Sequence, residues 1–140
     1  MKILVIGKNG QLGKSIHKII KNKKQINNFI FIGREELDFS NTQLIHSFFK
    51  NKKFDIIINC AAYTAVDKAE KEFDLVNQIN NLAVKELAKI SKTFNSKLIH
   101  ISTDYVFDGK KIKPYLETDL TNPINIYGKT KCDGEKSLKE

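Results

Sequence analysis

An apolar run that leads directly into a glycine-rich turn restricts the fold of this chain more than any other feature of its sequence. Residues 3–6 are all apolar, Gly7, Gly10 and Gly13 follow with two residues between successive glycines, and a helical pattern covers residues 11–22. In a strand–turn–helix unit, such glycines permit a tight turn, a close approach of backbone to a pyrophosphate, and close packing of helix on strand. The pattern predicts a dinucleotide site. The alternative is a glycine-rich turn that binds nothing.

The rest of the chain alternates between short apolar runs and helical patterns. The predicted strands are residues 2–6, 29–32, 55–59 and 97–102. The predicted helices are residues 11–22, a helix capped by Ser40 or Asn41 that includes residues 44–49, one long helix over residues 66–93, and a last helix opened by Pro123. Residues 21–28 and 103–122 are predicted connections. This alternation predicts the α/β class, with a Rossmann-type doubly wound parallel sheet.

Four strands are fewer than a complete Rossmann sheet normally has. We therefore expect residues 1–140 to form an incomplete NAD(P)-binding domain, truncated before a C-terminal substrate domain. An uncovered sheet edge can pair with a second chain, so a homodimer is one expected arrangement.

Composition narrows the partners of the chain. The net charge is +8, but 23 of the 24 basic residues are lysines spread over the whole sequence, which argues against a nucleic-acid surface. No apolar run approaches the ~20 residues of a membrane span, and the N-terminal apolar run is too short for a signal peptide, so a cytoplasmic protein is expected. Cys60 and Cys132 are far apart and lack metal-site spacing, so no metal is expected.

A candidate catalytic group lies near the C-terminal end. Tyr127 and Lys131 are four residues apart on the last predicted helix and share one face. An ammonium one turn away would lower the pKa of the phenol and so fit it for proton transfer. Ser102 and Thr103 lie at the carboxyl end of the fourth predicted strand, where open α/β sheets place their ligands. The alternative is an exposed tyrosine beside a solvated lysine.

Four segments together resemble a known family: residues 7–13, 59–70 (Asn-Cys-Ala-Ala-Tyr-Thr-Ala-Val-Asp-Lys-Ala-Glu), 102–107 (Ser-Thr-Asp-Tyr-Val-Phe) and 127–131 (Tyr-Gly-Lys-Thr-Lys). Their order and spacing are similar to those of the dTDP-4-dehydrorhamnose reductases, which are extended short-chain dehydrogenases/reductases. The resemblance covers the whole chain, but only the N-terminal half of that family's sequence. It implies reduction of the C4 ketone of a nucleotide sugar, dTDP-4-dehydro-L-rhamnose, by NADPH or NADH.

The resemblance also implies residue roles. Tyr127 would be the proton donor, Lys131 would orient the ribose and tune Tyr127, Thr103 would hydrogen-bond the keto oxygen, and Asp104 would lie near the sugar. The implied cofactor contacts are the glycine turn (Gly7, Gly10, Gln11, Leu12 and Gly13), Asp38 and Phe39 at the adenine, and Ala62, Tyr63 and Thr64 at the nicotinamide side. Tyr63 stands where relatives often carry His.

One arginine bears on the choice of cofactor. Arg34, the only arginine of the chain, follows the second predicted strand, where NAD-preferring folds place an acid. Arginine suits a 2′-phosphate, so NADPH is favoured over NADH. The alternative is a solvated loop residue. The residues after the glycine turn, 14–16, include no acid, so the metal-linked dimer contact of some members is not supported.

Two other functions stay open at this stage: a non-catalytic NAD(P)-binding module, like the related regulatory subunit of methionine adenosyltransferase, and another extended reductase or epimerase acting on a different nucleotide sugar. Retention of Thr103, Tyr127 and Lys131 argues against the first. We expect the 140-residue chain to bind NADPH but to turn over substrate poorly. His17, His46 and His100 are predicted to be structural, and Asn80 to bond nearby backbone.

Overall fold

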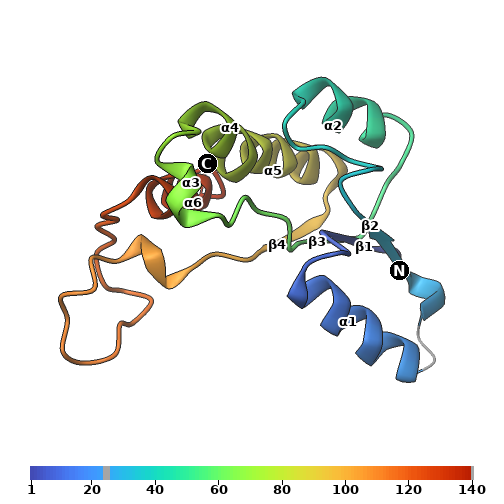
Figure 1. The fold of residues 1–140 in the computed structure, drawn as a ribbon. Helices are drawn as coiled ribbons and strands as arrows, with labels where there is room; N and C mark the ends of the chain where they lie inside the picture. The colour runs from blue at the N-terminus through green and yellow to red at the C-terminus, as the bar shows by residue number, and fades with distance from the viewer. Residues whose placement is uncertain (24–25, 140) are drawn as a thin grey trace.

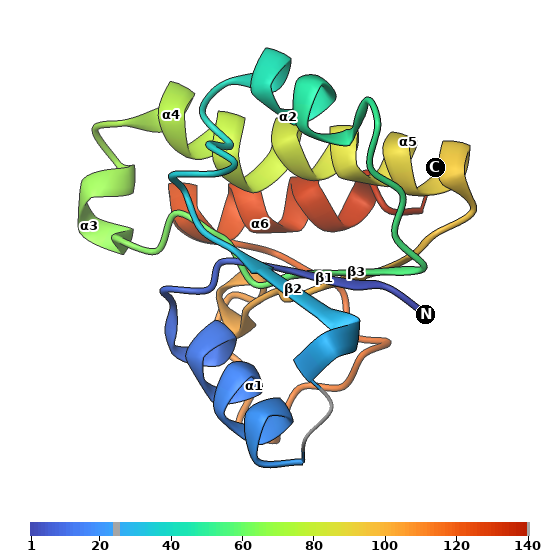
Figure 2. The same cartoon turned by 90° about the vertical axis from the view of Figure 1, so that its right-hand side faces the viewer.

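The computed structural model describes residues 1–23 and 26–139. Four strands, β1 (Ile3–Ile6), β2 (Phe29–Ile32), β3 (Ile56–Asn59) and β4 (Lys97–His100), form a parallel sheet in the order β2-β1-β3-β4. Helix α1 (Gln11–Asn22) lies on one face, and α2 (Thr42–Phe49), α5 (Ala83–Phe94) and α6 (Ile126–Lys136) lie on the other (Figures 1 and 2). The predicted α/β class and doubly wound parallel sheet are confirmed.

The main core lies between the sheet and the layer of α2 and α5. Leu4, Ile6 and Ile57 from the sheet are at most 1% exposed and belong to one apolar cluster with Ile45 of α2 and Leu87 of α5. Burying an aliphatic side chain of this size contributes about 1.5–3 kcal/mol. Because the chain goes from β1 outward to β2 on one side, while β3 and β4 lie on the other, the strand order reverses between β1 and β3. Open sheets bind ligands at such a point, beyond the carboxyl ends of the strands.

The predicted single helix over residues 66–93 is wrong. The structure has a short helix α3 (Val66–Ala69), a turn, and then a continuous helical run made of α4 (Phe73–Asn77), a π-helical stretch η2 (Gln78–Leu82) and α5. The two glutamates of the turn have distant partners: Glu70 accepts a hydrogen bond from the backbone N–H of Ile126 at 2.9 Å, and Glu72 accepts one from the Tyr63 hydroxyl at 2.5 Å. These tertiary contacts accompany a break that the apolar periodicity does not reveal.

The start of the last helix also differs from its prediction. Helix α6 begins at Ile126, and Asn125 is its N-cap, with the side-chain oxygen accepting from the Gly128 N–H at 2.7 Å. Pro123 therefore lies before the cap and does not open the helix. Asparagine is among the preferred N-cap residues because its side chain satisfies an N–H that the helix leaves unpaired.

Smaller differences concern element ends and connections. The predicted strands 2–6, 55–59 and 97–102 are each shorter in the structure by one or two residues, a common margin at strand ends. Asn41, rather than Ser40, caps α2. The connection 103–122 contains a 3-10 helix, η3 (Asp104–Val106), and the connection 21–28 contains another, η1 (Ile26–Asn28). Residues 24–25 of that connection and residue 140, predicted to lie in the last helix, are outside the described residues.

Candidate functional site

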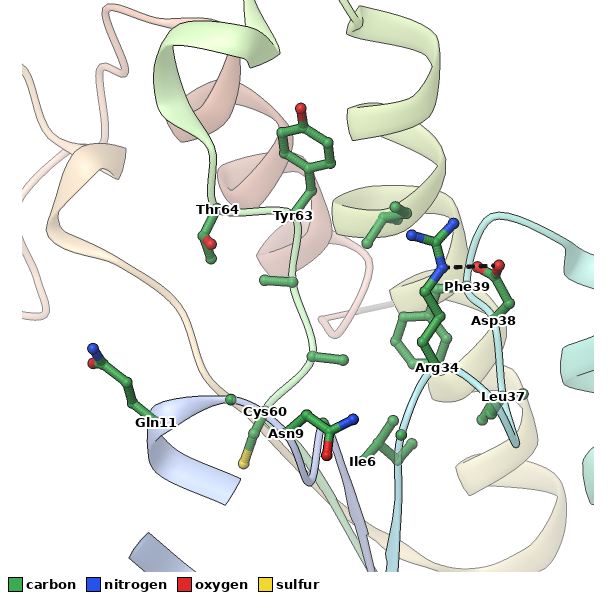
Figure 3. Close-up of a pocket in the computed structure, with 16 residues that line it drawn as sticks. Ile6, Asn9, Gln11, Arg34, Leu37, Asp38, Phe39, Cys60, Tyr63 and Thr64 are labelled. Atoms are coloured by element: carbon green, nitrogen blue, oxygen red, sulfur yellow. Dashed lines mark hydrogen bonds and ion pairs between the residues drawn. The ribbon is translucent and has the colours of Figure 1, made fainter. Parts of the chain in front are cut away.

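A cavity of about 710 Å³ lies where the carboxyl ends of β1, β2 and β3 meet (Figure 3). Its walls come from the three turns that follow these strands, together with Ile79 from the helix across. Nine of the predicted cofactor residues line it: Gly7, Gly10, Gln11, Arg34, Asp38, Phe39, Ala62, Tyr63 and Thr64. The volume falls within the range typical of small-molecule and cofactor sites.

Two glycines of the first turn have no room for a side chain. Gly7 has a φ of +94°, and a Cβ there would lie 2.8 Å from the Ala61 nitrogen. A Cβ on Gly13 would lie 2.2 Å from the Gly7 carbonyl oxygen, so α1 packs directly on the turn. Gly10 differs, because its Cβ would meet only the Gly7 oxygen, at 3.4 Å. The turn and helix packing therefore require Gly7 and Gly13, whereas the fold alone does not require Gly10.

The N-terminus of α1 opens on this turn. Among the described residues, no side chain caps it, and no acidic residue lies in its first turn. The first N–H groups of a helix have no intrahelical partner, and the helix dipole adds partial positive charge. This end of α1 is thus suited to a phosphate group. Gln11 lines the cavity, whereas Leu12 and Gly13 are not among its lining residues.

The second turn supplies a cation and a carboxylate. The Arg34 Nε donates to Asp38 Oδ2 at 3.1 Å (Figure 3). The Arg34 side chain is 73% exposed. Burial alone would raise the pKa of Asp38, but hydrogen bonds from Ser40 and from Arg34 hold it below its usual value. Phe39, which is buried, adds an apolar wall. The carboxylate is therefore ionised near neutral pH and holds the guanidinium at the mouth of the cavity.

The third turn is fixed by two buried asparagines. Asn59, the last residue of β3, accepts from the Ala61 N–H at 3.1 Å. Asn80, from η2, accepts from the Tyr63 N–H at 2.9 Å and donates to the Tyr63 carbonyl at 3.1 Å. The prediction that Asn80 bonds backbone is confirmed. The Tyr63 ring leans away from the turn toward Glu72, whose hydrogen bond raises the pKa of the Tyr63 phenol.

The predicted catalytic residues lie outside the walls of this cavity. Tyr127 is 9% exposed, belongs to an apolar cluster with Ala69 and Val76, and meets the Tyr105 ring edge-on at 5.6 Å between centroids. Lys131 is 1% exposed, and its Nζ donates to the Ile101 carbonyl at 2.5 Å. The alternative of an exposed tyrosine beside a solvated lysine is therefore wrong.

The strand-end hydroxyls have local partners. Thr103 Oγ1 donates to the Asp104 carboxylate at 3.1 Å and accepts from the Tyr105 N–H at 3.3 Å. Ser102 Oγ donates to Glu135 on α6. Thr103 thus faces the start of η3, whereas Ser102 is tied to the helix that carries Tyr127 and Lys131.

Several lining residues were not predicted: Ile6, Asn9, Gly33, Leu37 and Ile79. The first four adjoin or lie within the predicted strand-end turns, so their positions could have identified them. Ile79 could not be found in this way, because the helix that carries it meets the cavity only through the tertiary fold. Within residues 1–23 and 26–139, no group of three or more His, Cys, Asp and Glu side chains is placed to hold a metal ion. None of the helices in that part of the chain is long and apolar enough to cross a membrane.

Comparison with known proteins identifies the family of the chain. The profile of the RmlD substrate binding domain matches residues 1–140. The dTDP-4-dehydrorhamnose reductase of Escherichia coli (strain K12) is 41% identical over 100% of this chain and 47% of its own length.

Two solved structures of proteins with the same name are also similar to this chain. A crystal structure of a dTDP-4-dehydrorhamnose reductase from Clostridium acetobutylicum has a TM-score of 0.92 at 45% identity, covering 99% of this chain and 49% of that one. The enzyme of the same name from Bacillus anthracis, solved in complex with NADP, has a TM-score of 0.89 at 38% identity, covering 99% and 50%. The chain spans about half the length of the relatives it matches. By this match over its whole length, the chain belongs to the RmlD substrate binding domain family.

Proposed function

We propose that this chain is the NAD(P)-binding part of a nucleotide-sugar reductase, which reduces the C4 ketone of dTDP-4-dehydro-L-rhamnose with NADPH to give dTDP-L-rhamnose. The observation that carries the proposal is the cavity itself. Three strand-end turns and the uncapped end of α1 converge on one space of about 710 Å³, at the point where strand order reverses.

The residues that line the cavity suit a dinucleotide that carries a 2′-phosphate. One wall consists of the glycine backbone of the first turn, which has no side chains, and the first N–H groups of α1. Such a wall suits a pyrophosphate. Arg34 stands at another wall and would pair with a 2′-phosphate, and Phe39 would lie against the adenine. Ala62 and Thr64, with their small side chains, would face the nicotinamide side. Bound NADPH would supply the hydride that reduces the ketone carbon.

The protein's own part in the reaction is proton delivery. Tyr127 would donate its phenolic proton to the C4 oxygen, so that hydride and proton together convert the ketone to an alcohol. Thr103 would hydrogen-bond the same oxygen, and Asp104 would contact the sugar. Lys131, one helical turn from Tyr127, would orient the ribose of the cofactor.

The test combines binding with turnover. Calorimetry on the purified chain should detect NADPH binding. The complete gene product of the source cells should consume NADPH when given dTDP-4-dehydro-L-rhamnose. Tyr127→Phe should lower that rate by ~100-fold or more, the usual loss when a general acid is removed. Tyr115→Phe is the matched control, since the Tyr115 hydroxyl donates to Asp108 in the 103–122 connection. Absence of NADPH binding, or a rate unchanged in Tyr127→Phe, would refute the proposal.

A further inference from the structure

At the carboxyl ends of β3 and β4, the side chains of Asn59 and His100 connect the third turn of the cavity to Lys131. Asn59 and His100 are the last residues of β3 and β4 and are direct partners in the parallel register. The Asn59 Nδ2 lies 3.0 Å from His100 Nδ1, and the Lys131 Nζ lies 3.2 Å from His100 Nε2. Asn59 and Lys131 are each 1% exposed. The contacts run in series from the Ala61 backbone to Lys131.

The direction of this series is fixed at its first member. The Ala61 N–H can only donate, so the Asn59 atom that faces it, at 3.1 Å, is the amide oxygen. The Asn59 amide nitrogen must then face His100, and it too can only donate. His100 Nδ1 must therefore be the acceptor and carry no proton. A neutral imidazole carries one proton, which in this case lies on Nε2.

The consequence falls on Lys131. His100 Nε2–H points at the Lys131 Nζ, and an ammonium has only donors, so the charged lysine would set donor against donor. A neutral amine has a lone pair that accepts from Nε2–H, while one of its hydrogens is donated to the Ile101 carbonyl. The series from Ala61 through Asn59 and His100 to Lys131 is complete in one form only, with Lys131 uncharged.

We propose that Asn59 and His100 are positioning residues for Lys131, whose hydrogen bonds favour its neutral amine over its ammonium. The pKa values agree in direction. Burial lowers the pKa of Lys131 from 10.5 to about 8, against the opposing effect of Glu135 one turn along α6. Burial lowers the pKa of His100, and the charge that Lys131 carries when protonated lowers it further, to about 4, so the imidazole is neutral near pH 7.

The proposal links two parts of the molecule that the candidate site uses separately. The Asn59 oxygen holds the third turn of the cavity, and its nitrogen sets the tautomer that acts on Lys131. If the proposed function holds, Asn59 and His100 act on Tyr127 through the charge of Lys131. The hydrogen-bond series itself does not depend on that function.

The test is nuclear magnetic resonance on the whole chain, without cofactor or substrate. Nitrogen-15 spectra should show His100 with a bare Nδ1 and a protonated Nε2. Carbon-13-labelled lysine, with the Lys131 signal assigned from its loss in Lys131→Met, should give a pKa of about 8 for Lys131. An Nδ1-protonated tautomer, or a Lys131 that titrates like an exposed lysine, would overturn the proposal.

Two variants separate the hydrogen bonds from burial alone. His100→Gln places an amide beside Lys131 whose oxygen can face the ammonium, so the pKa of Lys131 should rise by at least ~1 unit with no charge added. Asn59→Asp should reverse the series, leaving His100 protonated on Nδ1. Glu135→Gln is the control and should lower the pKa of Lys131 instead.

If His100→Gln folds and leaves the pKa of Lys131 unchanged, burial alone sets that pKa and the proposal fails. If Asn59→Asp does not fold, the tautomer of His100 in the wild type and the pKa of Lys131 in His100→Gln still test the proposal. A reductase assay that failed would leave all these readouts intact.

Discussion

Asn80 holds the backbone of Tyr63 from both sides, with its amide oxygen 2.9 Å from the Tyr63 nitrogen and its amide nitrogen 3.1 Å from the Tyr63 carbonyl oxygen. The same amide nitrogen also donates to the Thr130 hydroxyl of α6, at 3.3 Å. One side chain on the π-helical stretch thereby connects the third turn of the cavity to the helix that carries Tyr127 and Lys131. Helix α6 comes so close here that a Cβ on Gly134 would lie 2.3 Å from the Asn80 carbonyl oxygen.

Asn80→Ala should therefore destabilise the protein by about 2–4 kcal/mol, because it leaves the two Tyr63 backbone groups and the Thr130 hydroxyl without this partner. Urea unfolding followed by circular dichroism measures the change. The control is Asn81→Ala next to it, whose amide donates to Asn77 within the same helical run at 2.9 Å and accepts a long hydrogen bond from the Ser137 hydroxyl at 3.4 Å. This variant should cost less than ~1 kcal/mol. Equal losses in the two variants would mean that Asn80 does not hold the turn.

The glycine turn allows fold and binding to be tested separately. Gly13→Ala would drive a methyl group against the Gly7 carbonyl, a backbone atom that cannot turn aside, and should cost about 3 kcal/mol or more. Gly10→Ala has room in the fold, so its unfolding midpoint should stay near that of the wild type. It should nevertheless weaken NADPH binding by about tenfold, or ~1.4 kcal/mol, because its methyl group adds bulk at the wall proposed for the pyrophosphate. Thermal unfolding and calorimetry measure the two effects. A Gly10→Ala chain that binds like the wild type would place the pyrophosphate elsewhere.

The part of the site that could be predicted from sequence is the part built from local segments. Gly7, Arg34 and Ala62 each lie in a turn directly after a strand, and parallel strands bring such turns to one edge of the sheet. The contacts of Lys131 could not be predicted from local segments. His100 looked like an ordinary strand residue, and only the register of β3 with β4 sets it beside Asn59. The break at residues 70–72 could not be predicted for the same reason, since the partners of Glu70 and Glu72 are distant in sequence.

Arg34 should decide the choice between the two nicotinamide cofactors. Arg34→Gln removes the guanidinium proposed to meet the 2′-phosphate, and a hydrogen bond to a charged group is worth about 1.5–3 kcal/mol. The variant should lose about tenfold or more in affinity for NADPH and keep its affinity for NADH, as measured by calorimetry with both cofactors. Arg34→Lys keeps the positive charge but lacks the planar guanidinium, so its affinity for NADPH should lie between those of the wild type and Arg34→Gln. Parallel losses for NADPH and NADH would show instead that Arg34 acts on the turn through Asp38.

His100 should make the stability of the protein depend on pH in an acidic window. Its pKa is lowered from 6.5 to about 4 in the folded protein, by burial first and by the charge of Lys131 second. Between these two values the unfolded chain binds a proton at this residue that the folded chain does not, so the free energy of unfolding falls as the pH is lowered from 6.5 toward 4. The full contribution is present above pH 6.5, and the loss attributable to this single group is at most about 3 kcal/mol. Urea unfolding at several pH values should give a shallower dependence in His100→Gln than in the wild type. The same slope in both proteins would mean that folding does not lower the pKa of His100, which would contradict a buried, neutral His100 beside Lys131.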